Sequence, residues 1–389
     1  MMELDERGFG ETGDHAVCLE CILDEGLRRQ VGYHLTEPAC TFCGRKSEDG
    51  TSVAASFKAL MEPVMDAIRF FYERSIDSLF TEDDFTPRYS SDEVADDVCT
   101  GAVSEDVLEA IKEVINEDEW NEDPGPLPPD VALIHAWIKF VDKVKHQTRF
   151  VFLSLPEKHS DHPDDFTTTE TLQKLTKIIK SRGVLAEIPA GHIFYRGRLA
   201  DKPGQFAHDA ASLGSPPLMK ASANRLSPAG ISMFYGCDDI ATVVAEIGSH
   251  TSKRYAVVGE FETTRSLRIV NLAALPEASV FDPDEREAYY DLSFLYDFAR
   301  DLSAPVVLDG SEHIEYVPTQ VVTEYLRWVP HFPIDGILYR SAQNGGTCCV
   351  IFCGPEGCAN EEKVTDKTML RLRDGSAKAV RVVASAAES

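Results

Sequence analysis

Three arginines and one glutamate in residues 194–247 are the side chains whose types and spacing best suit binding chemistry. Arg196 and Arg198 end an apolar, aromatic run, and Arg225 lies in the Gly- and Pro-containing loop that follows. Planar guanidinium groups bind phosphate oxygens in pairs, so this arrangement suits a diphosphate. Glu246 closes the stretch on an otherwise apolar helix face, where a carboxylate is costly unless it is paired or used. The stretch therefore predicts a diphosphate site with a single acid.

Two Cys-x-x-Cys pairs near the N-terminus form a second constellation with a chemical meaning. Cys18 and Cys21 make up the first pair, and Cys40 and Cys43 make up the second. Each pair places two thiolates on one side of a tight turn, and together they supply the four sulfur ligands of a tetrahedral zinc site. Because protein would fill all four positions, the predicted zinc is structural. The alternative is four unrelated core thiols.

The elements that must position these residues fall into three predicted modules. Residues 1–50 hold the cysteine pairs and form a zinc-knuckle module. Residues 51–183 show apolar side chains at helical spacing, which predicts a helical domain. Residues 184–389 combine β-rich runs with helices and are the predicted catalytic domain. Near its end, Asp374-Gly375 is typical of a β-hairpin turn, so a C-terminal hairpin is expected.

Four blocks of the sequence follow one another in the same order as the motifs of a known family. They are FYRGR (194–198), TVVAEI (242–247), EYVPTQVVTEYLR (315–327) and DGILYRSAQNGGTCCVIF (335–352). Together they resemble the RES family, the NAD-consuming toxin domains named for Arg, Glu and Ser. Four blocks in order are more specific than any one motif. The zinc knuckle and helices before them resemble the N-terminal module that often accompanies HEPN and RES domains.

This resemblance implies an α+β fold with a mixed β core like that of ADP-ribosyltransferases, and it implies NAD+ as substrate. The nicotinamide–ribose bond of NAD+ breaks through an oxocarbenium-like transition state, as in glycoside cleavage. An enzyme for this step anchors the pyrophosphate and places negative charge near the developing cation. The implied function is an NAD+-degrading toxin or defence effector. The acceptor would be water, phosphate or a protein side chain.

The resemblance also implies roles for individual residues around one shared cavity. Glu246 would bond the ribose hydroxyls and stabilise positive charge at the anomeric carbon, and Tyr235 would stack on the nicotinamide or orient the ribose. Alternatives stay open, because Arg198 would also suit a surface ion pair, Tyr235 the core and Ser341 a turn cap. The implied catalytic residues are Arg196, Tyr235, Glu246 and Ser341, and the implied binding residues are Arg198, Arg225 and Asn344.

The formal net charge of −27, from 38 basic and 65 acidic residues, argues against nucleic acid as a partner. No apolar run reaches the roughly eighteen residues of a membrane-spanning helix. The first residues are polar and acidic, unlike a secretory signal. We therefore expect a cytoplasmic protein that binds NAD+ and an antitoxin or other regulatory protein, with oligomer formation left open.

Two other functions compete with this interpretation. Arg29 and His34 match the Arg-x4-His pattern of HEPN-type ribonucleases, although here the pattern falls inside the zinc module. The second alternative is a non-enzymatic binding module, in which the zinc knuckle and acidic helices recruit a partner and the RES-like part only binds nucleotide. Substitution of Glu246 tests the enzyme against the binding module through cellular toxicity or protection, and substitution of His34 tests the ribonuclease through RNA decay.

Overall fold

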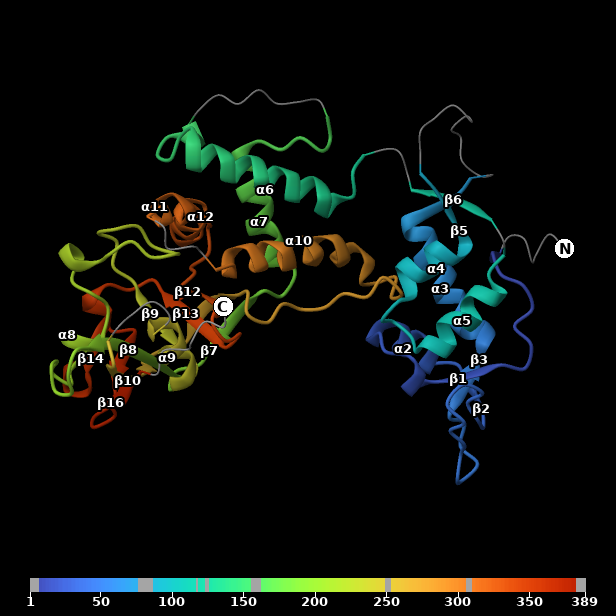
Figure 1. Cartoon of the computed structure of the whole chain (residues 1–389), viewed down its shortest axis with the longest axis horizontal. Coiled ribbons are helices and arrows are strands. Elements are labelled where there is room, and N and C mark those ends of the chain that lie inside the picture. The colour runs from blue at the N-terminus through green and yellow to red at the C-terminus, as the bar shows by residue number, and fades with distance from the viewer. Residues whose placement is uncertain are drawn as a thin grey trace. The chain divides into compact units, whose positions relative to one another are not determined.

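The computed structural model describes residues 7–75, 87–116, 118–122, 126–154, 162–248, 253–305 and 310–382 (Figure 1). Its chain divides into two compact units. Unit 1 comprises Met1–Pro129 and Glu277–Asp291, and unit 2 comprises Asp130–Pro276 and Leu292–Ser389. The boundaries of these units differ from those of the three predicted modules, because the zinc module shares unit 1 with the first helices.

The first part of unit 1 is a three-stranded antiparallel sheet with the helices that follow its strands. The elements are β1 (Ala16–Cys18), α2 (Glu25–Gly32), β2 (Leu35–Glu37), β3 (Ala54–Ser56) and α3 (Phe57–Phe71). The strand order is β1–β3–β2. Helix α2 begins after Asp24, whose carboxylate accepts a 2.7 Å hydrogen bond from the N–H of Leu27 and so caps the helix.

The second part of unit 1 joins another three-stranded sheet to further helices. The elements are β4 (Tyr72–Arg74), β5 (Arg88–Ser90), α4 (Ser91–Cys99), α5 (Glu105–Val114) and β6 (Glu119–Glu122). Ser90 and Glu93 form a capping box at the start of α4. One hydrophobic cluster runs from Phe9 to Trp120, so both parts of unit 1 share a core.

Residues 277–291 return from the second half of the sequence to complete this core. Val280 and Phe281 are buried and belong to the same hydrophobic cluster as the residues of α3 and α4. Tyr289 packs edge to face on Phe71 of α3, with ring centroids 5.5 Å apart. We call residues 277–291 the insertion. The core of unit 1 is therefore incomplete without a segment that lies about two hundred residues later in the sequence.

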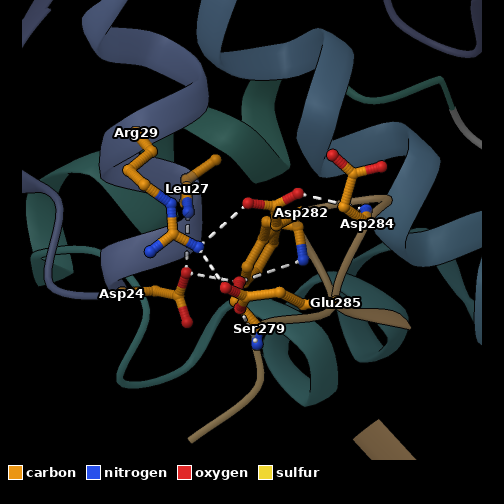
Figure 2. Close-up of polar contacts among 8 residues, drawn as sticks. Asp24, Leu27, Arg29, Ser279, Asp282, Asp284 and Glu285 are labelled. Atoms are coloured by element: carbon orange, nitrogen blue, oxygen red, sulfur yellow. Dashed lines mark hydrogen bonds and ion pairs between the residues drawn. The ribbon is translucent and has the colours of Figure 1, made fainter. Parts of the chain in front are cut away.

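A polar cluster holds the insertion against helix α2 (Figure 2). Ser279 Oγ donates a 2.6 Å hydrogen bond to Asp24 Oδ1, the oxygen that also caps α2. Arg29 forms ion pairs with Asp282, at 2.9 Å, and with Glu285. Since Arg29 is exposed and solvent screens its charge, these ion pairs contribute little to stability. The cluster mainly fixes the position of the insertion, while Phe281 and its neighbours supply the stability.

Phe281→Ala is therefore expected to destabilise unit 1 by about 3–5 kcal/mol, the usual effect of removing a buried phenylalanine. Hydrogen exchange of α3 and α4 amides in urea measures this change in the full chain. Tyr33→Ala is the matched control, because that aromatic side chain belongs to unit 1 but is 80% exposed. Equal exchange rates in the two variants would mean that the insertion does not belong to the core of unit 1.

Unit 2 is built on one large mixed sheet (Figure 1). Its strands are β7 (Leu185–Ile188), β8 (Ile193–Ala200), β9 (Phe234–Cys237), β10 (Tyr255–Thr263), β11 (Leu267–Asn271), β12 (Gly336–Arg340), β13 (Thr347–Ile351), β14 (Cys358–Asn360), β15 (Leu370–Leu372) and β16 (Lys378–Arg381). Their order is β14–β15–β10–β8–β9–β13–β12–β11–β7, with β16 also paired to β10. The pairs β11–β12 and β14–β15 are parallel, and the other pairs are antiparallel. The predicted mixed β core is confirmed.

The predicted C-terminal hairpin is wrong. The turn at Asp374-Gly375 exists, with Gly375 at a φ of 70°, but β15 and β16 do not pair with each other in the sheet. Both pair with β10, β15 along Phe261–Thr263 and β16 along Tyr255–Val258. The nine-residue strand β10 is long enough to pair with two short strands one after the other along the same edge. Pairing with β10 therefore replaces the local hairpin between β15 and β16.

Helices flank the sheet of unit 2. They are α6 (Pro129–His146), α7 (Thr168–Ser181), α8 (Ala210–Leu213), α9 (Ile240–Gly248), α10 (Arg286–Ser303), α11 (Glu312–Glu315) and α12 (Val317–Trp328). Helix α7 begins with a capping box formed by Thr167 and Glu170. Helix α10 gives its first residues to the insertion and the rest to unit 2. Among the described residues, no helix combines the length and the apolar character needed to cross a membrane.

Candidate functional site

Glu246 of α9 and Ser341, the residue after β12, form the central contact of the candidate site. The Ser341 hydroxyl donates a short hydrogen bond to Glu246 Oε1. Ser341 is 4% exposed, and Glu246 is half-buried. The turn after β12 fixes the serine, since the N–H of Ser341 donates to the carbonyl of Gly346 and the N–H of Gln343 donates to Ser341 Oγ. The structure thus brings together two predicted residues that lie 95 positions apart.

The first turn of α9 is attached to the same turn through Thr242 and Asn344. Asn344 Nδ2 donates a 3.1 Å hydrogen bond to Thr242 Oγ1, and Thr242 donates in turn to the carboxylate of Asp239. These bonds hold the pKa of Asp239 below its usual value. Gly346 lies so close to Thr242 that any Cβ there would collide with the hydroxyl. Asn344, predicted to bind NAD+, thus aligns the helix that carries Glu246.

Tyr235 of β9 lies half-buried on the face of the sheet that α9 covers. Its hydroxyl is 2.8 Å from Ser227 Oγ, and Gln320 of α12 donates to the backbone carbonyl of Ser227. Burial raises the pKa of Tyr235 to about 12, so the phenol is neutral at physiological pH. The structure therefore gives Tyr235 a polar partner and a fixed orientation.

Arg196 lies on the other face of the sheet. Paired residues of neighbouring strands share a face, and Tyr195 pairs with Cys237, which is two positions from Tyr235. Arg196 therefore points away from α9, and its guanidinium lies 5.2 Å from the Phe234 ring. It donates to the carbonyls of Leu213, at 2.9 Å, and Tyr235, at 2.6 Å. Arg196 does not share the expected cavity with Glu246, because strand alternation separates them.

The other two predicted arginines also donate to backbone carbonyls. Arg198 is exposed, donates to Ser212 at 3.0 Å and lies 4.0 Å from the Phe206 ring centroid. Arg225 donates to the carbonyls of Leu302, at 2.8 Å, and Ala304, at the end of α10. A cation at a helix C-terminus satisfies carbonyls that have no partner within the helix. Arg225 thus connects the loop before Tyr235 to α10.

Several contributors to the site were missed by sequence analysis. Ser227 and Thr242 orient Tyr235 and α9, and each is buried. Tyr339 pairs with Cys348 on β13, so it lies on the Tyr235 face, and burial raises its pKa. Thr242 precedes Glu246 by one helical turn, and Tyr339 precedes Ser341 by two positions. Helical and strand periodicity could therefore have identified both.

The four N-terminal cysteines gather into one cluster in unit 1. The Sγ atoms of Cys18, Cys21, Cys40 and Cys43 all lie within 4.8 Å of one another. The separations are 3.5 Å for Cys18–Cys43 and 3.8 Å for Cys18–Cys21 and Cys21–Cys40. Zn–S bonds of about 2.3 Å in a tetrahedron separate the sulfurs by about 3.8 Å. The donor set and its spacing fit a metal ion held by four thiolates.

Arg29 and His34, the residues of the HEPN-type ribonuclease alternative, have different surroundings in unit 1. Helix α2 ends at Gly32, so His34 lies beyond the helix and is exposed. Arg29 is engaged with Asp282 and Glu285 of the insertion (Figure 2). Its contacts give Arg29 a structural role in unit 1, where the sequence pattern had suggested a catalytic one.

Two family models match the chain. Residues 34–158 match HEPN/RES N-terminal domain 1, and residues 198–373 match the RES domain. No curated protein and no solved structure matches. RES domains are in general NAD-utilising and of toxin type. The matched range includes Tyr235, Glu246 and Ser341 as well as the insertion.

Proposed function

Because the chain carries a RES domain, we propose that it is an NAD+-degrading toxin or defence effector that cleaves the nicotinamide–ribose bond. The observation that carries the proposal is the hydrogen bond between Ser341 and the half-buried Glu246. A half-buried carboxylate that a hydroxyl holds in place suits a ribose whose anomeric carbon becomes positive. Tyr235 on the same side of the sheet suits the flat nicotinamide ring.

In the proposed mechanism, Glu246 stabilises the charge that develops as nicotinamide leaves. The carboxylate attracts the oxocarbenium-like transition state more strongly than the ground state, which lowers the barrier. Ser341 orients the carboxylate and bonds a ribose or phosphate oxygen of bound NAD+. Tyr235 stacks on the nicotinamide, and its neutral hydroxyl is available to bond the ribose.

The three arginines position other parts of the site in this proposal. Arg196 is a positioning residue, because it holds the backbone carbonyl of Tyr235 from the opposite face of the sheet. Arg225 positions the loop before Tyr235 through the end of α10. Arg198 lies two positions from Arg196 on β8 and shares the face away from Glu246, so we assign it the positioning of Ser212 and no contact with NAD+. Asn344 acts through Thr242 on the helix that carries Glu246.

We also propose that the sheet is of the ADP-ribosyltransferase type, which the acid-bearing helix packed across a mixed sheet supports. The acceptor then defines the reaction. Incubation of the purified chain with NAD+, with and without phosphate, followed by mass analysis, distinguishes the outcomes. ADP-ribose alone indicates a glycohydrolase, and ADP-ribose phosphate indicates a phosphorylase. A protein that gains the mass of ADP-ribose indicates a transferase, and intact NAD+ in both incubations contradicts the proposal.

Zinc is the metal that we propose for the four-cysteine site, with a structural role. Four thiolates leave no open position for substrate, and tetrahedral sulfur coordination is typical of structural zinc. The site belongs to unit 1, whose core includes Cys18, Cys21 and Cys40. We propose a regulatory part for this unit, such as binding an antitoxin.

Substitutions of Tyr235 are expected to separate stacking from hydrogen bonding. Tyr235→Phe keeps the ring and loses the Ser227 contact, so NAD+ cleavage should fall only about 2- to 10-fold. Tyr235→Ala also loses the ring, and stacking is worth about 1–3 kcal/mol, so a further loss of roughly 5- to 150-fold follows. Initial rates of nicotinamide release measure both. Tyr255→Phe on β10 is the control, and equal rates in all variants would exclude a role for Tyr235.

A further inference from the structure

Two cysteines face each other across strands β9 and β13. Cys237 pairs directly with Cys348 in the antiparallel register, and their Sγ atoms are 3.1 Å apart. Both side chains are buried, at 5% and 1% exposure. The two residues are 111 positions apart in the sequence, so the fold alone brings them together.

The backbone hydrogen bonds show that Cys237 and Cys348 form a non-hydrogen-bonded pair of the antiparallel ladder, the type with the shorter Cα–Cα distance. The N–H of Asp238 donates to the carbonyl of Thr347 at 3.1 Å, so this backbone hydrogen bond lies beside the pair and does not connect Cys237 to Cys348. Opposed Cα atoms at such positions are about 4.5 Å apart, within the range of about 4.4–6.8 Å found in disulfides. The sulfurs need to approach by only about 1 Å to bond at about 2.05 Å.

The pair lies on the face of the sheet that carries the candidate site. Cys237 is two positions from Tyr235 on β9, and Cys348 is opposite Tyr339 on β12. Cys349, one position further along β13, points to the other face and packs in the core there. A covalent bond between Cys237 and Cys348 would therefore act on the strand that positions Tyr235.

We propose that Cys237 and Cys348 form a redox-modification site, which a hydroperoxide converts into a disulfide across β9 and β13. The site itself is independent of NAD+ chemistry. Its effect on catalysis rests on the function proposed above.

The chemistry uses one hydroperoxide for two thiols. Either thiol can donate in the hydrogen bond between the two sulfurs. One sulfur of the pair attacks the peroxide, the O–O bond breaks, and a sulfenic acid forms while water or an alcohol leaves. The other sulfur then attacks the sulfenic sulfur and a water leaves. Two electrons pass from the thiols to the peroxide, and both thiol protons end in the released products.

The disulfide should have two measurable consequences. It closes a loop of more than a hundred residues, which is expected to raise the Tm of unit 2 by about 5 °C or more. It also fixes β9 to β13 covalently beside Tyr235, where a misplacement of about 1 Å would cost up to about 100-fold in rate. We expect NAD+ cleavage to fall at least about 10-fold and to recover on reduction.

The test uses the zinc-loaded full chain, treated with hydrogen peroxide, alkylated and digested for mass mapping. The expected result is a peptide pair joined through Cys237 and Cys348, about 2 Da lighter than the reduced peptides. The competing target is Cys358, whose pKa falls to about 7 because of its hydrogen bond with Cys353. A cross-link only between Cys353 and Cys358, or none in unit 2, would overturn the proposal.

Variants connect the cross-link to its consequences. Cys348→Ser and Cys237→Ala should each lose the Tm shift, and the control Cys349→Ala should keep it. A Tm shift that persists in both variants would overturn the assignment. A mapped cross-link in a protein whose reduced form leaves NAD+ intact would support the redox site and contradict the proposed function. A cross-link that leaves NAD+ cleavage unchanged would overturn the coupling to Tyr235.

Discussion

Glu246→Gln is expected to lower the rate of nicotinamide release from NAD+ at least about 100-fold, the usual cost of losing one charged or hydrogen-bonding group at a transition state. The amide keeps the size of the side chain and still accepts a hydrogen bond from Ser341. It lacks the negative charge that stabilises the anomeric cation. Single-turnover kinetics with saturating NAD+ measure the chemical step, and a binding titration checks that affinity for NAD+ changes little.

Glu324→Gln is the matched control for this prediction. Glu324 is a half-buried glutamate on helix α12 of the same unit, and burial raises its pKa. It has no contact with Ser341 among the described interactions, so its variant should cleave NAD+ at the wild-type rate. Equal losses in the Glu246 and Glu324 variants would indicate general destabilisation, and no loss in either would remove Glu246 from the mechanism.

Removal of the metal is expected to unfold unit 1. Structural zinc in small domains contributes about 10–16 kcal/mol of binding free energy that is also folding free energy. Here Cys18, Cys21 and Cys40 are themselves part of the core that holds α2, α3 and the insertion. Chelation, or Cys40→Ser, should therefore abolish protection of the α3 amides from hydrogen exchange and expose Phe281 to solvent.

Cys99→Ala provides the control for metal loss. Cys99 is buried in the same core but lies outside the four-cysteine cluster. Its variant should keep about one zinc per chain in elemental analysis, and unit 1 should stay folded. Full protection of α3 after complete removal of zinc would contradict a structural role for the metal.

Local spacing was enough to predict some parts of the structure. The four cysteines gather because each Cys-x-x-Cys pair encodes its own tight turn, and only two such turns had to meet. Glu246 and Ser341 were each visible as polar residues at the edge of apolar elements. That they touch depends on the sheet order, which the sequence did not predict.

Other parts depend on long-range packing that no local pattern encodes. The insertion joins unit 1 because Val280 and Phe281 fill its core, although they lie within the RES-matched range. The arginines were predicted to share one cavity with Glu246, because the sequence does not show which face of β8 helix α9 covers. Side chains alternate between the two faces along β8, and α9 packs against Gly197. Arg196 therefore lies on the face of the sheet away from Glu246.

A crystal structure of the Glu246→Gln variant with NAD+ tests the central claim most directly, because the slow variant should retain its intact substrate. We predict that the nicotinamide ribose lies within hydrogen-bond distance of the side chains at positions 246 and 341, with the nicotinamide ring against Tyr235. NAD+ bound on the Arg196 face of the sheet, away from position 246, would contradict the account.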